Sequence, residues 1–368
     1  MRMWCSSCPR HCATERRLFQ PTLNSSPEGM ACHTLYPSYF SPVTGRTAPM
    51  AVYTEVTDEA LAAFLAEYDI GTAVAFRGIA EGVENSNYVL RTTGGDYILT
   101  LYEKRVDPND LPWFLGLMEH LAARGITCPQ PVRGRDGQAL RMLCGRHAAI
   151  TGFLPGVWPR KVQGAHCHPV GEVLAKLHEA GADYTPTRPN ALGPEGWPPL
   201  LAICRSRADE ISPGLGEELQ KALDRVLAAW PSDLLTGHIH ADLFPDNVFF
   251  LDDRLSGVID FYFAATDALA YDIAIALNAW CFESDHTYNI TKGSALLRGY
   301  NAIRTLTEAE KAALPVLCQG AALRFALTRL FDWLNTPPGA MVTRKDPMDY
   351  VYRLRFHLSA PNAGAYGL

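Results

Sequence analysis

The stretch that decides the fold is His240-Ala241-Asp242-Leu243-Phe244-Pro245-Asp246-Asn247, followed thirteen residues after Asn247 by Asp260 within Ile259-Asp260-Phe261. Between the two, apolar runs at 248–251 and 257–259 flank the pair Asp252-Asp253. Two short apolar runs around polar turn residues predict a β-hairpin. This hairpin places Asp260 beside Asn247 on neighbouring strands.

These residue types suit phosphoryl transfer. In that chemistry one carboxylate accepts the proton of an attacking hydroxyl, while an amide and a second carboxylate hold Mg²⁺ against a triphosphate. His, Asp and Asn are also common in loops, so the H-x-D-x-x-x-x-N skeleton would be a weak signal on its own. The hairpin and the second Asp, which apolar residues flank, make chance a poor explanation. The pattern therefore favours a kinase-type site.

Outward from this stretch, the chain divides into a sheet-rich part and a helical part. In the first part strands are expected at 73–77, 87–91, 97–102, 139–143 and 147–153, and helices at 57–68, with Thr57 as a candidate N-cap, and 111–124. After Leu154-Pro155-Gly156 helices are expected at 170–180, 199–211, 217–230, 271–282, 291–303, 308–334 and 347–357. The sequence thus predicts an α+β fold in which a small antiparallel-sheet lobe is joined by a short hinge to a larger helical lobe, with a cleft between them.

Length and composition narrow the class of protein. A chain of 368 residues exceeds what one hydrophobic core usually organises, so two lobes are expected. The net charge of −6 leaves no basic excess to neutralise nucleic-acid phosphates. The most apolar run, Ala268–Phe282, is too short for a membrane span and carries Asp272. Six cysteines scattered over the body indicate a reducing compartment, so the protein is expected to be cytoplasmic, with a small-molecule substrate and neither nucleic acid nor membrane as a partner.

Residues 1–49 differ from the rest of the chain. They hold six prolines and four cysteines without helical or strand periodicity, and Cys5-x2-Cys8-x3-Cys12 imitates a zinc site without any framing element. We expect a disordered extension, and Met50 as a plausible natural start. The expected domains are then 50–154, the nucleotide-binding N-lobe, and 155–368, the C-lobe with the catalytic loop and substrate site.

The constellation around Asp242 resembles the aminoglycoside phosphotransferase and choline kinase superfamily, whose members share the protein-kinase fold. The resemblance runs from about Thr57 to His357. Gly171–His178 is similar to the family's G-x-x-L-A-x-L-H helix, and Tyr271-Asp272-Ile273-Ala274 to its Y-D-L-A motif.

This resemblance implies ATP as the phosphoryl donor and Mg²⁺ as the metal. The roles that it implies are a catalytic base for Asp242, metal binding for Asn247 and Asp260, adenine binding for the backbone of Gly152 and Leu154, and support of the catalytic loop for His240 and Asp272. His178 is expected to pack or cap at its helix end.

The segment Gly78–Ser86 fits a loop that covers phosphates, with Gly82 in the loop and Asn87 at the start of the next strand. Backbone N–H groups and the Ser86 hydroxyl would donate to phosphate oxygens. The family's phosphate-binding lysine is absent, since Thr100 aligns with it; Lys104 is a possible substitute, and Glu119 would be the partner acid.

A threonine at this position is typical of the type II homoserine kinase branch of the superfamily. The segments 85–88, 188–197, 323–334, 345–347 and 354–357 also resemble that branch. The resemblance implies ATP-dependent phosphorylation of the side-chain hydroxyl of L-homoserine, a step toward threonine.

Homoserine is zwitterionic, so its site needs a cation for the carboxylate, and Arg324 and Arg329 in an otherwise apolar helix are the candidates. Arg329 could instead pair within its helix with Asp332 or Trp333. Other acceptors remain open: choline would need an aromatic cage, for which Trp197, Trp280 and Trp333 are available, and an aminoglycoside would need an acidic groove. Methylthioribose is a further possible acceptor. A catalytically dead kinase-like module is disfavoured because all three catalytic and metal-binding residues are intact.

Overall fold

The computed structural model describes residues 54–79, 85–103, 106–336 and 344–368, all within one compact unit, Ser38–Leu368. The predicted extension at 1–49 lies outside the described residues, as do Gly82 and Lys104.

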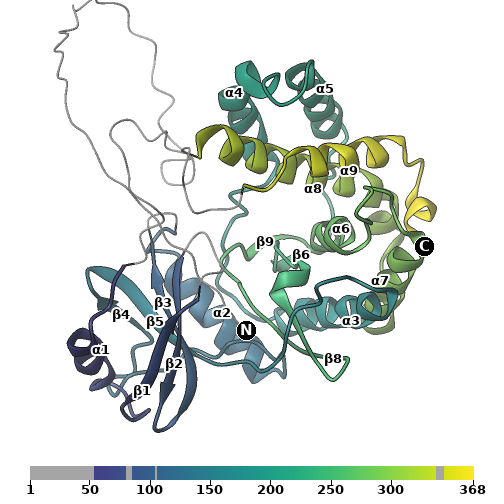
Figure 1. Cartoon of the computed structure of the whole chain (residues 1–368). Helices are drawn as coiled ribbons and strands as arrows, with labels where there is room; N and C mark the ends of the chain where they lie inside the picture. Colours follow the sequence, from purple (N-terminus) through teal and green to yellow (C-terminus); the bar gives the residue numbers. More distant parts are fainter. Residues whose placement is uncertain (1–53, 80–84, 104–105, 337–343) are drawn as a thin grey trace, which may run out of the picture. The chain divides into compact units, whose positions relative to one another are not determined.

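A five-stranded antiparallel sheet forms the first part of the described chain (Figure 1). Its order is β1-β2-β3-β5-β4, and its strands are β1 (Ala73–Gly78), β2 (Asn85–Thr92), β3 (Gly95–Tyr102), β4 (Leu140–Leu143) and β5 (Arg146–Gly152). Helix α1 (Asp58–Leu65) begins where Thr57 accepts a hydrogen bond from the Ala60 N–H, as the sequence predicted. The five predicted strands are therefore all present, with ends shifted by one or two residues.

Two hydrophobic cores organise the molecule. In the smaller core, α1 packs Leu61 and Phe64 against sheet residues such as Leu90 and Leu99. Helix α2 (Leu111–Ala123), which follows the third strand, contributes instead to the larger core that contains the C-lobe helices. By packing, α2 thus belongs with the helical lobe, although it precedes the hinge in sequence.

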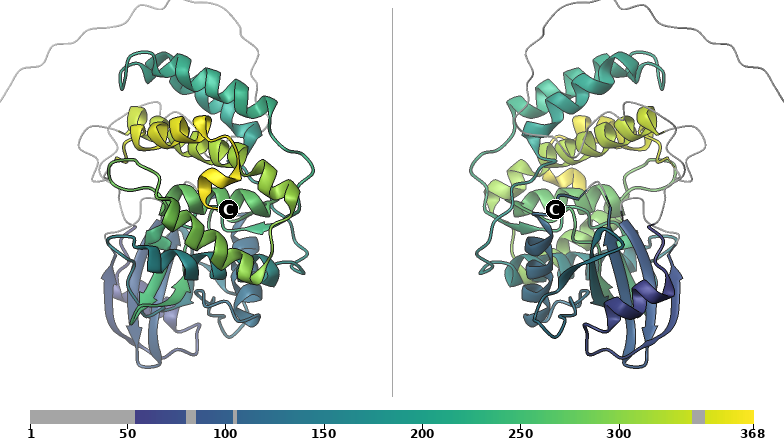
Figure 2. Two further views of the ribbon diagram at one scale, coloured as in Figure 1. Left: turned by 90° about the vertical axis from the view of Figure 1, so that its right-hand side faces the viewer. Right: turned by 90° about the vertical axis from the view of Figure 1, so that its left-hand side faces the viewer.

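Seven helices of the described chain follow the hinge: α3 (Gly164–Ala180), α4 (Trp197–Ala208), α5 (Leu215–Ala228), α6 (Leu269–Trp280), α7 (Ile290–Ile303), α8 (Glu308–Asn335) and α9 (Met348–Ser359). Short 3₁₀ turns are η1 (Pro194–Gly196), η2 (Pro245–Asn247) and η3 (Ala363–Tyr366). Figure 2 shows α4 and α5 together beyond α8, on the side away from the sheet. Among these helices, none is both long and apolar enough to cross a bilayer.

Helix α3 begins six residues before the predicted start, because Pro169 does not end it. Gln163 and His166 form a reciprocal cap, in which the Gln163 N–H donates to His166 Nδ1 at 3.0 Å. This cap satisfies the first turn, and the helix continues through Pro169, which lies inside it and cannot donate to the Ala165 carbonyl.

Glycines allow α3 and α7 to approach closely. A Cβ atom on Gly171 would collide with the Leu296 carbonyl oxygen, and a Cβ atom on Gly299 with that of His168. The glycine of the G-x-x-L-A-x-L-H motif is therefore required by backbone contact between two helices.

Two small sheets carry the stretch that decides the fold. The predicted hairpin is present as β7 (Val248–Leu251) and β8 (Arg254–Val258), with Asp252 and Asp253 both at positive φ in its turn. The second sheet pairs β6 (Thr236–Ile239) with β9 (Ala265–Ala268) and was not predicted, because four residues without alternation give no strand signal. Strand β6 leads directly into His240.

Candidate active site

The structure brings Asp242, Asn247 and Asp260 together. Asn247 Nδ2 donates to the backbone oxygen of Asp242 at 2.8 Å and to its Oδ2 at 3.1 Å. The Ile259 N–H donates to the Asn247 carbonyl at 2.9 Å, which holds the neighbouring Asp260 at this end of the hairpin.

The electrostatics of the two carboxylates reflect burial without a cation. Burial raises the pKa of Asp242 well above its ordinary value, and the charge of Asp260 adds to this rise. Burial likewise raises the pKa of Asp260 to about 6. Within the described residues neither carboxylate forms an ion pair with Lys, Arg or His. Such a pair is a suitable ligand set for an added cation.

A divalent metal could be held by Asp260 and by Oδ1 of Asn247, since both hydrogen bonds of the Asn247 amide use Nδ2. Oxygen donors of this kind suit Mg²⁺. No cluster of three or more His, Cys, Asp or Glu side chains that could hold a metal occurs in the part of the chain that the structure describes. Other ligands, such as phosphate oxygens, would have to complete the coordination.

The backbone of the catalytic loop is fixed by Asp272, the fourth residue of α6. Asp272 accepts hydrogen bonds from the N–H groups of His240 at 2.6 Å and Ala241 at 2.9 Å. These bonds hold Ala241 at φ +60°, a conformation that residues other than glycine rarely adopt.

The His240 imidazole joins the two ends of the site. Its Nε2 donates to the Ile259 carbonyl at 3.0 Å, and its Nδ1 accepts from the Asp242 N–H at 3.3 Å. These bonds assign the neutral tautomer, and burial lowers the pKa of His240. His240 therefore contacts the loop backbone and holds it in place.

Asp272 is the end of a buried polar chain. The chain consists of Asp272, His178, Tyr300, Arg304 and Glu310. His178 Nε2 lies 3.2 Å from Asp272 Oδ2, and His178 Nδ1 lies 2.7 Å from the Tyr300 hydroxyl. Arg304 Nη1 donates to the same hydroxyl at 3.0 Å. Arg304 Nη2 donates to Glu310 at 2.6 Å. Burial opposes ionisation of Asp272, but the hydrogen bond and charge of His178 lower the pKa of Asp272 below its ordinary value. His178 packs near the end of α3, as expected, and in addition connects α3 to the residue that holds the catalytic loop.

The two candidate substrate arginines have different environments. Arg324 is 1% exposed, donates from Nη1 to the Ala241 carbonyl at 2.6 Å, and lies beside Asp242. Arg329 instead forms an ion pair with Asp349 of α9 at 3.0 Å and lies over the ring of Tyr350. Only Arg324 is in contact with the catalytic loop.

The residues expected at the phosphates lie on two faces of the sheet. Thr100 donates to Asn87 at 2.8 Å on the face that also carries Tyr102, whose hydroxyl lies 2.8 Å from that of Tyr262. Ser86 lies on the opposite face, where its hydroxyl donates to Glu103 at 2.8 Å. Ser86 and Thr100 thus point to opposite faces of the sheet, and the contact of the Ser86 hydroxyl with phosphate stays a prediction.

The expected partner acid for a cation on this strand is also corrected. Glu119 lies on α2, but it pairs with Arg133 at 2.5 Å. Glu119 is thus engaged in a surface ion pair with Arg133.

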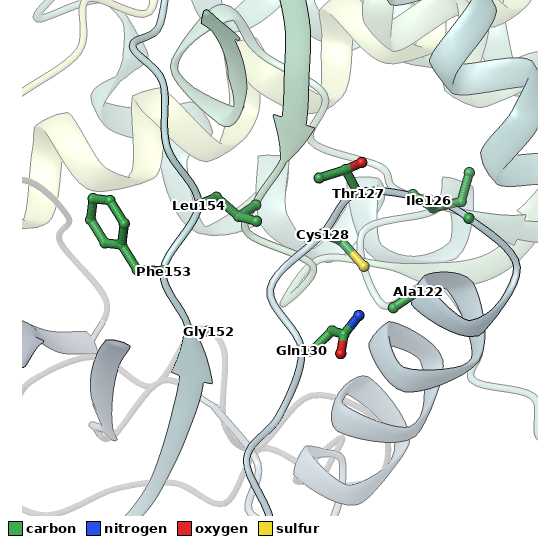
Figure 3. A pocket seen from close by; sticks show the side chains of 9 residues that line it. Ala122, Ile126, Thr127, Cys128, Gln130, Gly152, Phe153 and Leu154 are labelled. Atoms are coloured by element: carbon green, nitrogen blue, oxygen red, sulfur yellow. The ribbon is translucent and has the colours of Figure 1, made fainter. Parts of the chain in front are cut away.

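The hinge lines a pocket of about 360 Å³ (Figure 3). The Gly152 N–H donates to the Gln130 carbonyl at 2.9 Å and the Phe153 N–H to that of Asp96 at 3.3 Å. For the Leu154 N–H no acceptor occurs among the described residues. Figure 3 shows Leu154 and Phe153 pointing to opposite sides of the hinge, with Leu154 toward Thr127. The pocket is lined by Ala122, residues 125–128, Gln130 and residues 152–154.

The structure adds Lys345, which the sequence analysis quoted but gave no role. Lys345 Nζ lies 5.8 Å from the ring centre of Phe244, and its charge opposes the raised pKa values of Asp242 and Asp260. One lysine between charged neighbours gave no signal in the sequence.

The tryptophans considered for a choline cage do not form one. Trp197 and Trp280 are fully buried and donate to the carbonyls of Leu192 and Leu243, and Trp333 lies under Arg344.

Comparisons with known proteins agree with this geometry. Residues 75–306 match the model of the phosphotransferase enzyme family. A relative named homoserine kinase from Granulibacter bethesdensis is 98% identical over 319 residues, which is 87% of this chain and 100% of the relative. Another homoserine kinase, from Acidiphilium cryptum, is 70% identical over the same shares of both chains.

Solved structures share the fold at low identity. An amicoumacin kinase matches with a TM-score of 0.64 and 16% identity, over 84% of this chain and 95% of its own. A spectinomycin phosphotransferase matches with a TM-score of 0.59 and 13% identity, over 85% and 98%. The chain therefore belongs to the phosphotransferase enzyme family, where it groups with the proteins named homoserine kinase and has the protein-kinase-like fold.

Proposed function

We propose that the protein transfers the γ-phosphoryl group of ATP to the side-chain hydroxyl of L-homoserine, yielding ADP and O-phospho-L-homoserine, with Mg²⁺ as the metal. The observation that carries this proposal is the 98% identity to a homoserine kinase over the whole of that relative. The reaction belongs to threonine biosynthesis, and the protein works in the cytoplasm.

Asp242 is the catalytic base of this reaction. Its carboxylate is oriented by Asn247 Nδ2, and its raised pKa makes it a stronger proton acceptor than an exposed aspartate. The substrate hydroxyl passes its proton to Asp242 as its oxygen attacks the γ-phosphorus and the bond to ADP breaks.

Asn247 and Asp260 would hold Mg²⁺, and the metal would supply charge stabilisation for the phosphates. Two features support this ligand set: Oδ1 of Asn247 is left available, and Asp260 is buried without a cation among the described residues. Gly152 and Leu154 would bind adenine through the hinge backbone, while Asn87 and Thr100 line the sheet face nearest to Tyr262.

The test is a Mg²⁺-dependent ATP-turnover assay with L-homoserine, choline, methylthioribose and kanamycin under identical conditions. We expect the highest kcat/KM for L-homoserine. Asp242→Asn, purified in the same way, excludes turnover by a contaminating kinase. Faster turnover of choline or kanamycin would overturn the proposal, and no turnover of any acceptor would favour a binding module.

A further inference from the structure

Buried polar atoms without a hydrogen-bond partner gather beside Asp242. Among the described residues they include Arg324 Nε and the hydroxyls of Tyr271 and Tyr350. All three side chains are almost completely buried. The charge of Arg324 opposes the rise that burial causes in the pKa of both tyrosines, so both lie within its electrostatic reach. Unsatisfied buried polar atoms are rare in native proteins, and several at one place indicate a missing ligand.

Arg324 is the most deeply buried arginine of the described chain, and like Arg353 it donates to a backbone carbonyl. Arg188 pairs with Asp110 at 2.8 Å, and Arg304 pairs with Glu310 at 2.6 Å. Arg324 has no carboxylate partner among the described residues, and its one hydrogen bond goes to a backbone carbonyl. Burial of a guanidinium without a close ion-pair partner is costly, so a further anion is favoured there in addition to the nearby charge of Asp242.

Asp267, at the end of β9, carries the complementary charge. Its Oδ2 accepts from Asn190 Nδ2 at 2.7 Å, and its Oδ1 accepts from the Ala268 N–H at 2.7 Å. Within the described residues it has no cationic partner. Burial raises the pKa of Asp267 and Arg324 opposes this, so the two charges lie near each other without forming an ion pair.

We infer, resting on the proposed function, that Arg324, Tyr271 and Asp267 form a receptor for the α-amino-acid head group of the substrate. Arg324 and the Tyr271 hydroxyl bind the carboxylate, and Asp267, which Asn190 holds in place, binds the ammonium group. Both charges of an amino acid sit on one carbon, so their partners must lie close together, and Arg324 and Asp267 interact electrostatically. The hydroxyl arm then extends toward Asp242, the residue that follows Ala241, whose carbonyl Arg324 contacts.

The receptor is tested by removing one charge at a time from ligand and protein. Calorimetry measures Kd, and turnover measures kcat/KM, for L-homoserine, 3-aminopropanol without the carboxylate, and 4-hydroxybutyrate without the ammonium group. Tyr271→Phe removes only an oxygen that forms no well-aligned hydrogen bond with the described residues, so stability should be largely retained. We expect it to weaken homoserine about 10-fold, the scale of a hydrogen bond to a charged group, and to leave 3-aminopropanol unchanged.

Asp267→Asn is expected to give the reverse pattern. It should weaken homoserine and 3-aminopropanol about 10-fold or more, and leave 4-hydroxybutyrate unchanged or improved. Tyr68→Phe is the matched control, because the Tyr68 hydroxyl is also buried and unpartnered in the described chain and its ring also faces an arginine, Arg141, but in the N-lobe core. Tyr68→Phe should leave unchanged the ratios of Kd and of kcat/KM between homoserine and its two analogues.

The outcomes separate the receptor from the proposed function. If homoserine is phosphorylated but Tyr271→Phe and Asp267→Asn leave both ligand ratios unchanged, the receptor is wrong and the function stands. If homoserine binds, and both variants weaken it as expected, but no phosphate is transferred, the receptor stands and the function fails. Absence of homoserine binding to the wild-type protein with ADP and Mg²⁺ overturns the receptor.

Discussion

The two sides of Asp242 are both polar and both buried, yet they differ in how their atoms are satisfied. On one side, the buried polar chain from Asp272 to Glu310 joins each member to the next by hydrogen bonds. On the other side, Arg324 Nε and the Tyr271 hydroxyl have no partner in the described chain. Burial alone therefore does not separate residues that hold the fold from residues that could contact a ligand, and the number of hydrogen-bond partners adds a second criterion.

Asp242 lies between the two sides, and its substitution gives the largest effect. Asp242→Asn keeps the size of the side chain but removes the proton acceptor, so kcat should fall by roughly 10²–10⁴ with little change in KM for ATP. Steady-state kinetics and a thermal melt measure this. Near-full turnover would show that Asp242 is not the base, and a large drop in Tm would place it with the structural side.

Substitution of Asp260 tests whether the metal site belongs to the side of Asp242 on which buried polar groups lack hydrogen-bond partners in the described chain. Asp260→Ala removes a carboxylate that forms no ion pair among the described residues, but it also places alanine at a φ of +66°, so only a modest loss of stability is expected. Nucleotide binding and rate should fall together, by on the order of 10²-fold in kcat/KM for ATP, because a metal ligand is lost. Titration of Mg²⁺ at fixed ATP measures it, and an unchanged Mg²⁺ requirement would contradict the assignment.

Substitution of His178 tests the other side of Asp242, where the buried polar groups are hydrogen-bonded to one another. His178→Phe leaves Asp272 without one donor and Tyr300 without its acceptor, so the free energy of unfolding should fall by about 3 kcal/mol. Urea unfolding measures the loss, and kcat should fall while KM for homoserine changes little. Tyr300→Phe, which removes only the far end of the contact, is the milder control. Unchanged stability in His178→Phe would remove the distinction between the two sides.

His357 extends the comparison to pH, because it is a second fully partnered buried group. It contacts Asn278 and Tyr366, and burial, with a smaller effect of Arg353, lowers the pKa of His357 to about 3. Below about pH 6.5 the unfolded chain binds a proton that the folded protein does not. Its contribution to stability is therefore complete above pH 6.5 and is lost, by up to about 1.4 kcal/mol per pH unit, as pH falls toward 3. Unfolding of the wild type and His357→Gln at pH 5, 6 and 7 should show a steeper decline in the wild type, and parallel curves would contradict this.

Removal of residues 1–49 should give the smallest effect. Both sides of Asp242 are built from the described residues, and the match to the 98% identical relative spans 319 of the 368 residues. We expect Tm and kcat/KM to stay essentially unchanged. A loss of many degrees in Tm, or zinc in the full-length protein by elemental analysis, would show that this segment is part of the folded structure.

Hydrophobic patterns within short segments of the sequence predicted the helices and strands that those segments form. The apolar runs around Asp252-Asp253 were enough to predict the hairpin, and the periodic helices were found within a few residues of their expected ends, apart from the start of α3. The strand period also predicts that Ser86 and Asn87 face opposite sides of the sheet, as the structure shows.

Contacts between distant segments were not predictable in this way. His178, Tyr300 and Asp272 come from three helices, and nothing in the spacing of these residues indicates that they meet. Tyr271 precedes Asp272 in the sequence, yet one belongs to the unsatisfied side and the other to the satisfied side, because successive helix residues point about 100° apart. The hydrogen-bond partners of a residue can be counted only when the fold is known.

The backbone contact between α3 and α7 has a consequence for mutational tolerance. His178 and Tyr300 are carried by these two helices, and Gly171 and Gly299 fix the separation between them. A single methyl group at either glycine would push the helices apart, pull Tyr300 from His178, and so loosen Asp272 and the loop that it holds. Variation among natural sequences at these two glycines should therefore be restricted, although neither is proposed to contact nucleotide or acceptor.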